Sequence, residues 1–387
     1  MTSSPAPSLP CSSSADAAIA RLQSRKTAWM NTTIAERIDY LTQCLNGVIE
    51  ISHDWTNAAC RAKGIDPNSS LAGEEWLAGV VTTLMNLRSL INTLQANGQR
   101  PLPSVTIAGQ TRAKVFPQTL MDRLLWLGFE GEIWLEPGKP STQGKIYREP
   151  TSGKVALVLG AGNIASTPPM DSLYKLFGEN QVVLLKMNPV NDYLGQFLEK
   201  AFAPLIRDGF LQILCGGADL GRYLCQHPGI ETVHITGSDR THDAIVWGTS
   251  EPRTEPILQK PITSELGCVT PVLVVPGNWS TSDLAYQARH VASMVVHNAS
   301  FNCVAAKAIV LAKGWHQREE FLRLLHQEFV KIAPRNAYYP GAQERYQAFL
   351  DRYPNAQAFS DRTSEIIPWT VISDVPPTDH EYALNTD

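Results

Sequence analysis

The sequence predicts an α/β fold with a helical N-terminal segment and two doubly wound α/β domains, the second of them incomplete. The first observation is a set of short, continuous apolar runs, such as Val155–Leu159, which are typical of strands buried on both faces of a parallel sheet. The second is that helical patterns separate these runs, and strand–helix alternation favours a doubly wound sheet.

The composition fits a globular protein of two or three structural units. Apolar residues make up 43% of the 387 residues and charged residues 18%, which allows a sizeable core. The net charge of −4 and the lack of Lys/Arg-rich runs argue against a nucleic-acid or membrane-surface partner. No apolar stretch of the sequence is long enough to span a bilayer.

Three segments precede the first apolar run. Residues 1–30 begin small, polar and Pro-rich, without the features of a signal peptide, and are predicted to form a disordered tail. Residues 31–127 are predicted to form an N-terminal helical part, because apolar residues recur at i, i+3, i+4 and i+7 in 35–41 and 76–87. The helical pattern itself runs from about residue 33 to residue 98. Residues 99–150 combine Pro and Gly with short β-like runs, which are typical of connecting strands or a hairpin arm, and the β-arm is expected at 128–153.

The two α/β domains are expected at residues 154–267 and 268–387. In the first, strands are expected at 155–159, 182–185, 211–214 and 232–235, and helices at 170–177, 193–206 and 219–225. In the second, strands are expected at 271–275 and 308–311, and helices at 283–296 and 318–332. No closing strand or helix is evident before residue 387, so we expect a partial second domain in a truncated chain.

The seven cysteines are scattered along the chain. They are odd in number and form no Cys-x-x-Cys pair, which argues against a disulfide framework or a zinc site. A reduced, cytoplasmic setting fits this pattern better. In that setting each cysteine is either a core filler or a reactive thiol.

A glycine motif follows the first buried strand. Gly160-Ala-Gly-Asn-Ile-Ala165 fits G-x-G-x-x-A, the pattern of a dinucleotide-binding turn. However, the next strand ends in Leu185-Lys186, without the acidic residue that usually binds the ribose hydroxyls, and Pro168-Pro169 interrupts the following helix. Asn163 is better explained as an amide at the carboxyl edge of the sheet, where it could donate to a developing oxyanion.

Further segments between about Lys154 and Leu311 occur in the order and near the spacing of a known family. They are Gly162-Asn163, Gly178-Glu-Asn180, Leu185-Lys186, Cys215-Gly-Gly-Ala-Asp-Leu-Gly221, His234-Ile-Thr-Gly-Ser238, Ser264-Glu-Leu-Gly-Cys268 and Asn298-Ala-Ser-Phe-Asn-Cys303. The last three are similar to Phe-Thr-Gly-Ser, Glu-Leu-Gly-Gly and Asn-x-Gly-Gln-x-Cys. With these segments the chain resembles the aldehyde dehydrogenase superfamily, whose two domains are Rossmann-like.

The resemblance implies an oxidoreductase that acts on an aldehyde with NAD or NADP as acceptor. Cys303 would be the nucleophile that forms a thiohemiacetal and then a thioester. Glu265 would be the general base that activates water to hydrolyse the thioester. Asn163 would donate its amide to the carbonyl oxygen, beside the backbone N–H of Cys303.

The resemblance also implies a cofactor site. Lys186 is expected on the adenosine ribose, Gly217 and Gly221 beside the adenine, Thr236, Gly237 and Ser238 near the pyrophosphate, and Leu266 and Gly267 near the nicotinamide. Pro189 stands where the family often carries a ribose-binding Glu, so the choice between NAD and NADP stays open.

Departures from the family motifs leave alternatives. Cys268 replaces a Gly, and Ser300-Phe301 replace Gly-Gln, changes that can shift the geometry of tight loops. The alternatives are an acyl-CoA-dependent, aldehyde-forming reductase of the same superfamily, which Glu265 disfavours, and a truncated, inactive relative that binds only nucleotide or a partner. By resemblance we also expect a homo-oligomer, a dimer or tetramer, formed through the arm around residues 128–148.

Overall fold

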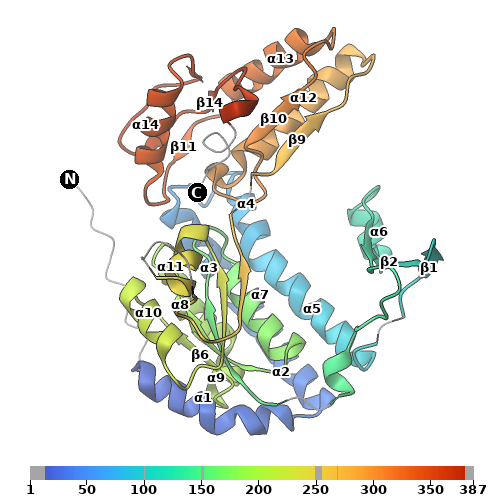
Figure 1. The fold of residues 1–387 in the computed structure, drawn as a ribbon, viewed down its shortest axis with the longest axis vertical. Helices are drawn as coiled ribbons and strands as arrows, with labels where there is room; N and C mark the ends of the chain where they lie inside the picture. Colours follow the sequence, from blue (N-terminus) through green and yellow to red (C-terminus); the bar gives the residue numbers. More distant parts are fainter. Residues whose placement is uncertain (1–13, 100, 150–151, 249–254, 268, 380–387) are drawn as a thin grey trace.

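The structure is a computed structural model that describes residues 14–99, 101–149, 152–248, 255–267 and 269–379. Figure 1 shows a large body built around α1, α2, α5 and β6, a smaller unit above it containing α12 and α13, and an arm that projects to one side. The cleft described below lies along the carboxyl ends of the strands in the large body.

Buried apolar strands form the sheet of the large body. Every residue of β4 (Val155–Leu159) and β5 (Val182–Lys186) is buried, as expected for strands covered on both faces. They join β6 (Leu211–Leu214), β7 (Thr232–Thr236) and β8 (Ile262–Glu265) in a parallel sheet with the order β6-β5-β4-β7-β8. This topology confirms the predicted α/β class.

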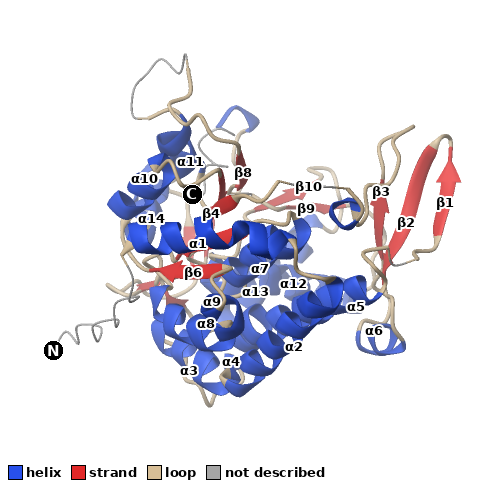
Figure 2. Cartoon of the chain, turned by 90° about the horizontal axis from the view of Figure 1, so that it is seen from below, coloured by secondary structure: helices blue, strands red, loops and turns tan. Residues whose placement is uncertain are grey.

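Helical segments connect these strands and pack on the sheet (Figure 2). They are α7 (Thr167–Leu173), η3 (Tyr174–Gly178), η4 (Asp192–Leu194), α8 (Gly195–Ala201), α9 (Ala203–Arg207), α10 (Ala218–Gln226) and α11 (Asp239–Val246).

The N-terminal helices complete the large body. They are α1 (Ala15–Met30), α2 (Ile34–Glu50), α3 (Ser52–Ala62), α4 (Ala72–Glu75), the π-helix η1 (Trp76–Val81) and α5 (Thr82–Gln95). α1 packs against β4, β5 and β6, so this segment is part of the core.

The prediction of a disordered tail over residues 1–30 is wrong for residues 15–30, which form α1. The Ser14 side chain caps this helix by accepting from the Ala17 N–H at 3.3 Å. Leu22 and Trp29 are fully buried, so burial against the sheet stabilises a helix whose amphipathic pattern is weak. Residues 1–13 lie outside the described residues.

The arm is longer than the sequence predicts. It begins at β1 (Ser104–Ile107) and β2 (Gln110–Phe116), continues through α6 (Leu120–Leu125) and ends in β3 (Gly131–Trp134), with the antiparallel order β1-β2-β3. The Pro- and Gly-rich pattern from residue 99 onward predicts such strands, and the start of the arm, expected at 128, is wrong. β1 is exposed throughout and β2 only half-buried, so neither strand carries the apolar pattern of a core strand. The short 3₁₀ segment η2 (Lys145–Tyr147) leads back to the body.

The upper unit is built on a parallel pair of strands, β9 (Pro271–Val274) and β10 (Ala308–Leu311). α12 (Thr281–Val296) and α13 (Arg318–Lys331) pack on the pair through a second apolar core. The turn η5 (His297–Ser300) follows α12 and leads to Cys303. The remaining elements are β11 (Arg335–Asn336), α14 (Ala342–Arg352), β12 (Gln357–Ala358), β13 (Ile366–Ile367), β14 (Thr370–Val371) and η6 (Pro377–Asp379).

The composition predicts that the chain has no membrane span and no disulfide framework. In the part of the chain that the structure describes, no helix has both the length and the apolar character needed to cross a membrane. The expectation of unpaired cysteines is wrong at Cys215, which is disulfide-bonded. Pairing depends on contacts made in the fold, and the scattered spacing of the cysteines carries no signal for it.

Candidate active site

A cleft of about 1440 Å³ runs along the carboxyl edge of the large sheet and under the loop that carries Cys303. This is the edge where open parallel sheets bind ligands. Most of the residues predicted for the site line it: Asn163, Lys186, Gly221, Thr236, Gly237, Ser238, Glu265, Leu266, Gly267 and Cys303. Gly217, at the N-terminus of α10, is not among the lining residues.

Cys303 is exposed in a turn between η5 and β10. Its thiol donates to Asn302 Oδ1 at 3.5 Å, and its carbonyl oxygen accepts from the Thr270 hydroxyl at 3.1 Å. Asn302 is itself buried, and its amide nitrogen lies 2.7 Å from His297 Nδ1. An accessible thiol is therefore fixed at the wall of the cleft by a buried amide.

The turn before Cys303 has an unusual backbone. Asn298, Ala299 and Ser300 have φ values of 54°, 52° and 67°, in the left-handed region that residues with a Cβ rarely adopt. Each such residue costs roughly 1–2 kcal/mol, so the turn must be held by its surroundings. Lys307 donates to Ser300 Oγ at 2.8 Å and also to the Ser300 carbonyl. Ser300 replaces the family's Gly here, and this contact helps to hold it.

Asn163 follows β4 and connects the two sides of the cleft. Its side-chain Nδ2 donates to the carbonyl oxygen of Phe301 at 2.8 Å, so the amide is tied to the loop that carries Cys303. An amide NH₂ group has two donors, and this bond uses one of them. The predicted oxyanion donor therefore lies against the loop that carries the predicted nucleophile, with one of its N–H groups engaged by Phe301.

Glu265 is the last residue of β8, and its side chain is exposed at the cleft. Its carbonyl oxygen accepts from the Gly237 N–H at 3.0 Å, which fixes the end of β8 beside the loop after β7. Asp171 is the other carboxylate among the described lining residues, and it accepts from the Thr236 hydroxyl at 2.8 Å.

The part of the cleft that is lined by Lys186, Gly221 and Ser238 suits a dinucleotide. Lys186 is 7% exposed, and burial lowers the pKa of its ammonium, while the Asp192 carboxylate opposes the shift. Ser238 caps α11 by accepting from the Thr241 N–H at 3.2 Å, so the anion-attracting end of this helix opens on the cleft. Gly221 faces open space, which leaves room for a flat ring.

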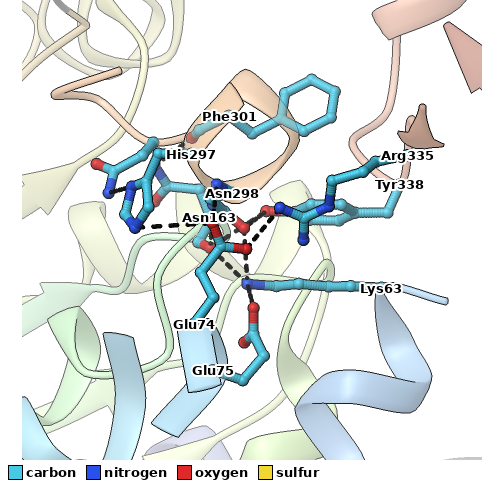
Figure 3. Close-up of polar contacts among 10 residues, drawn as sticks. Lys63, Glu74, Glu75, Asn163, His297, Asn298, Phe301, Arg335 and Tyr338 are labelled. Carbon is cyan, nitrogen blue, oxygen red and sulfur yellow. Dashed lines mark hydrogen bonds and ion pairs between the residues drawn. The ribbon is translucent and has the colours of Figure 1, made fainter. Parts of the chain in front are cut away.

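Behind the cleft lies a buried polar network that the sequence analysis does not predict (Figure 3). It joins Lys63, Glu74 and Glu75 from the N-terminal helices to side chains of the cleft loops and of the segment after α13. Glu75 comes three residues after the buried Ala72 and four residues before the buried Gly79, so it lies on the same face of the helix. A carboxylate on a buried stripe is the signal that could have found this network.

The aldehyde dehydrogenase family model matches residues 143–342, which is just over half of the chain. The chain belongs to the aldehyde dehydrogenase family. Among curated relatives, aldehyde dehydrogenase LUC3 of a Fusarium species is 26% identical over 153 residues, or 39% of this chain and 31% of the relative. The 3,6-anhydro-alpha-L-galactose dehydrogenase of Streptomyces coelicolor is 27% identical over 139 residues, or 36% and 26% of the two chains. The chain thus spans about a third, or less, of the length of these relatives.

Solved aldehyde dehydrogenases share the fold over nearly the whole chain. Aldehyde dehydrogenase C of Pseudomonas syringae, in complex with NAD+ and octanal, is similar with a TM-score of 0.65 and 16% identity, covering 93% of this chain and 67% of that one. The NADP-dependent glyceraldehyde-3-phosphate dehydrogenase of Bacillus halodurans, in complex with NADP, gives a TM-score of 0.65 and 15% identity, covering 94% and 69%. At these identities the likeness establishes the fold.

Proposed function

We propose that the chain oxidises an aldehyde to a carboxylic acid with NAD or NADP as acceptor. The observation that carries this proposal is an exposed thiol, Cys303, that shares one cleft with Glu265 and Asn163. Membership of the aldehyde dehydrogenase family supports it. The octanal and NAD+ bound to the Pseudomonas enzyme indicate the kinds of ligand to be tested.

The chemistry assigned to the chain has two stages. Cys303 adds to the aldehyde carbonyl, and the oxygen takes up negative charge. We assign the Asn163 N–H that Phe301 does not use, together with the Cys303 backbone N–H, to stabilise that oxygen. Glu265 then takes a proton from a water molecule that attacks the thioester, which releases the acid and the free thiol. Between these two stages the adduct must lose a hydride to become the thioester, and a bound nicotinamide would supply the acceptor.

The residues that would hold the cofactor are divided along the cleft. We assign Lys186 to the adenosine ribose, Thr236, Gly237 and Ser238 to the pyrophosphate, and Leu266 and Gly267 to the nicotinamide end. We assign Gly221 and Gly217 to the adenine, although Gly217 does not line the cleft. The chemistry of this donor set suits either NAD or NADP. Glu265 at the cleft disfavours the acyl-CoA-dependent reductase, which would not need a base for hydrolysis.

The assay that tests this function supplies the purified chain with NAD or NADP and a panel of aliphatic, aromatic and anionic aldehydes. We expect at least one pair to yield reduced cofactor and an equal amount of carboxylic acid. Samples without aldehyde control for background reduction. If the chain binds NAD or NADP but reduces neither with any aldehyde, the proposed oxidation is wrong.

We further propose that the chain forms a homo-oligomer through its arm. Leu124, Leu127 and Phe129 of the arm are exposed, with Leu127 at 84%, and an exposed apolar patch of this kind favours an interface. Light scattering should give a dimer or tetramer mass for the unmodified chain and a lower mass for Leu124→Glu/Leu127→Glu. A monomer mass for the unmodified chain at micromolar concentration would contradict the oligomer.

A further inference from the structure

The Lys63 ammonium lies at the centre of the network behind the cleft (Figure 3). Its side chain is 4% exposed and that of its partner Glu75 is fully buried, with Nζ and Oε1 2.8 Å apart. Lys63 also donates to Asn298 Oδ1 at 2.9 Å and to the Asn163 carbonyl oxygen at 3.3 Å. An ammonium has three donors, so these acceptors account for all of them.

The acceptors belong to the two loops that carry the proposed chemistry. Asn163 is the proposed oxyanion donor, and Asn298 begins the left-handed turn that leads to Cys303. Asn298 Nδ2 also donates to the Asn163 carbonyl at 3.0 Å, so the loops bind each other as well as Lys63. Lys63, Asn298 and Asn163 therefore form a closed ring of hydrogen bonds.

Further contacts brace this ring from other parts of the chain. The Tyr338 hydroxyl oxygen lies 3.2 Å from the Asn163 carbonyl oxygen and 3.1 Å from Asn298 Oδ1, so its single O–H is shared between these two acceptors. Burial raises the pKa of this hydroxyl, so it keeps its proton and remains a donor. Glu74 accepts the Asn298 N–H at 2.7 Å and pairs with Arg335 at 2.6 Å.

The energetics argue that this ion pair does not serve mainly to stabilise the fold. Taking two charges out of water costs more than their attraction often returns, and apolar replacements of buried pairs are frequently neutral or stabilising. Glu75 Oε2 is buried without a hydrogen-bond partner among the described residues, which adds to the cost. We therefore infer that the pair serves to hold the strained turn at 298–300 in place.

We propose that Lys63, charge-compensated by Glu75, is a positioning residue that holds Asn163 and the 298–300 turn so that the thiol faces the carbon, and the amide the oxygen, of the same substrate carbonyl group. The inference rests on the proposed function, since it assigns a role within aldehyde oxidation. Lys63 lies behind the loops, and it acts through Asn163 and Asn298.

The test compares Lys63→Met with Lys63→Met/Glu75→Leu. The single variant leaves a buried carboxylate without its partner and can lose stability, whereas the double variant removes both charges and should fold. In both, kcat should fall about 10- to 100-fold, because misplacing reacting groups by about 1 Å can cost 100-fold. KM for the aldehyde and Kd for the cofactor should change less than about two-fold, because Lys63 does not itself line the cleft and reaches it only through Asn163 and Asn298.

Lys26→Met is the matched control. Lys26 pairs with Glu231 at 3.0 Å near the start of β4, at the opposite edge of the sheet, and its loss should leave kcat unchanged. Hydrogen exchange supplies a readout that does not need activity. In the double variant, exchange should become at least about 10-fold faster in residues 160–166 and 297–304 and stay unchanged elsewhere.

The two proposals can fail separately. If the unmodified chain reduces no cofactor, the proposed function is wrong, and hydrogen exchange still decides whether Lys63 holds the two loops. A double variant with unchanged kcat, or with exchange in 160–166 and 297–304 equal to that of the unmodified chain, would overturn the positioning role. Faster exchange spread evenly over the whole chain would also overturn it, because it would show a role in global stability only.

Discussion

Replacement of Cys303 by Ser is expected to lower turnover on the order of 10⁴-fold or more while leaving cofactor binding intact. A serine hydroxyl ionises far less readily than a thiol, whose thiolate form is the nucleophile. The exposed thiol at the cleft makes this the largest effect that we expect from a single substitution. The measurement is the rate of reduced-cofactor formation, with cofactor Kd determined in parallel.

Cys44→Ala provides the matched control for this substitution. Cys44 is fully buried, and burial raises the pKa of its thiol to about 12, so it stays protonated near neutral pH. Its loss should lower the thermal stability and leave kcat within about two-fold of the unmodified chain. If turnover survives in Cys303→Ser but is lost in Cys44→Ala, Cys303 is not the nucleophile.

Glu265→Gln is expected to slow steady-state turnover by about 10²- to 10⁴-fold, the usual contribution of a general base. The first turnover should be much less affected, because hydride transfer precedes the hydrolysis that needs the base. Rapid mixing should therefore give a burst of reduced cofactor, close to one equivalent per site, followed by a slow phase.

Asp171→Asn controls for the loss of a carboxylate at the cleft. Asp171 is committed to the Thr236 hydroxyl, so its substitution should not produce a burst. If the burst appears in Asp171→Asn and Glu265→Gln keeps normal turnover, the base is Asp171 and not Glu265.

The sequence predicts the framework of the site well because buried parallel strands have a simple pattern. The run Val155–Leu159 is apolar and buried throughout. Its pattern therefore predicts a buried strand, the place of that strand in the chain and the residues at its carboxyl end. Most of the residues carried over from the family motifs follow these strands and line the cleft; Gly217 does not. Where a site residue directly follows a strand, the local pattern and the order along the chain are sufficient to predict its position.

Other features depend on contacts between distant parts of the chain. α1 has a weak amphipathic pattern, and only packing against the sheet makes it a helix of the core. Lys63, Asn298 and Tyr338 are far apart in sequence, so their meeting cannot be read from spacing. The bond from Asn163 to Phe301 likewise requires the loop geometry. These contacts belong to packing, which a single sequence does not specify locally.

We propose that Cys303 carries the substrate as a thioester. The direct test is mass spectrometry of Glu265→Gln, quenched in acid after mixing with cofactor and an aldehyde that the unmodified chain oxidises. We expect the acyl group on the peptide that contains Cys303, only when both cofactor and aldehyde are present, in an amount equal to the burst of reduced cofactor. Reduced cofactor formed without an acyl group on Cys303, or an acyl group on another residue, would contradict the claim.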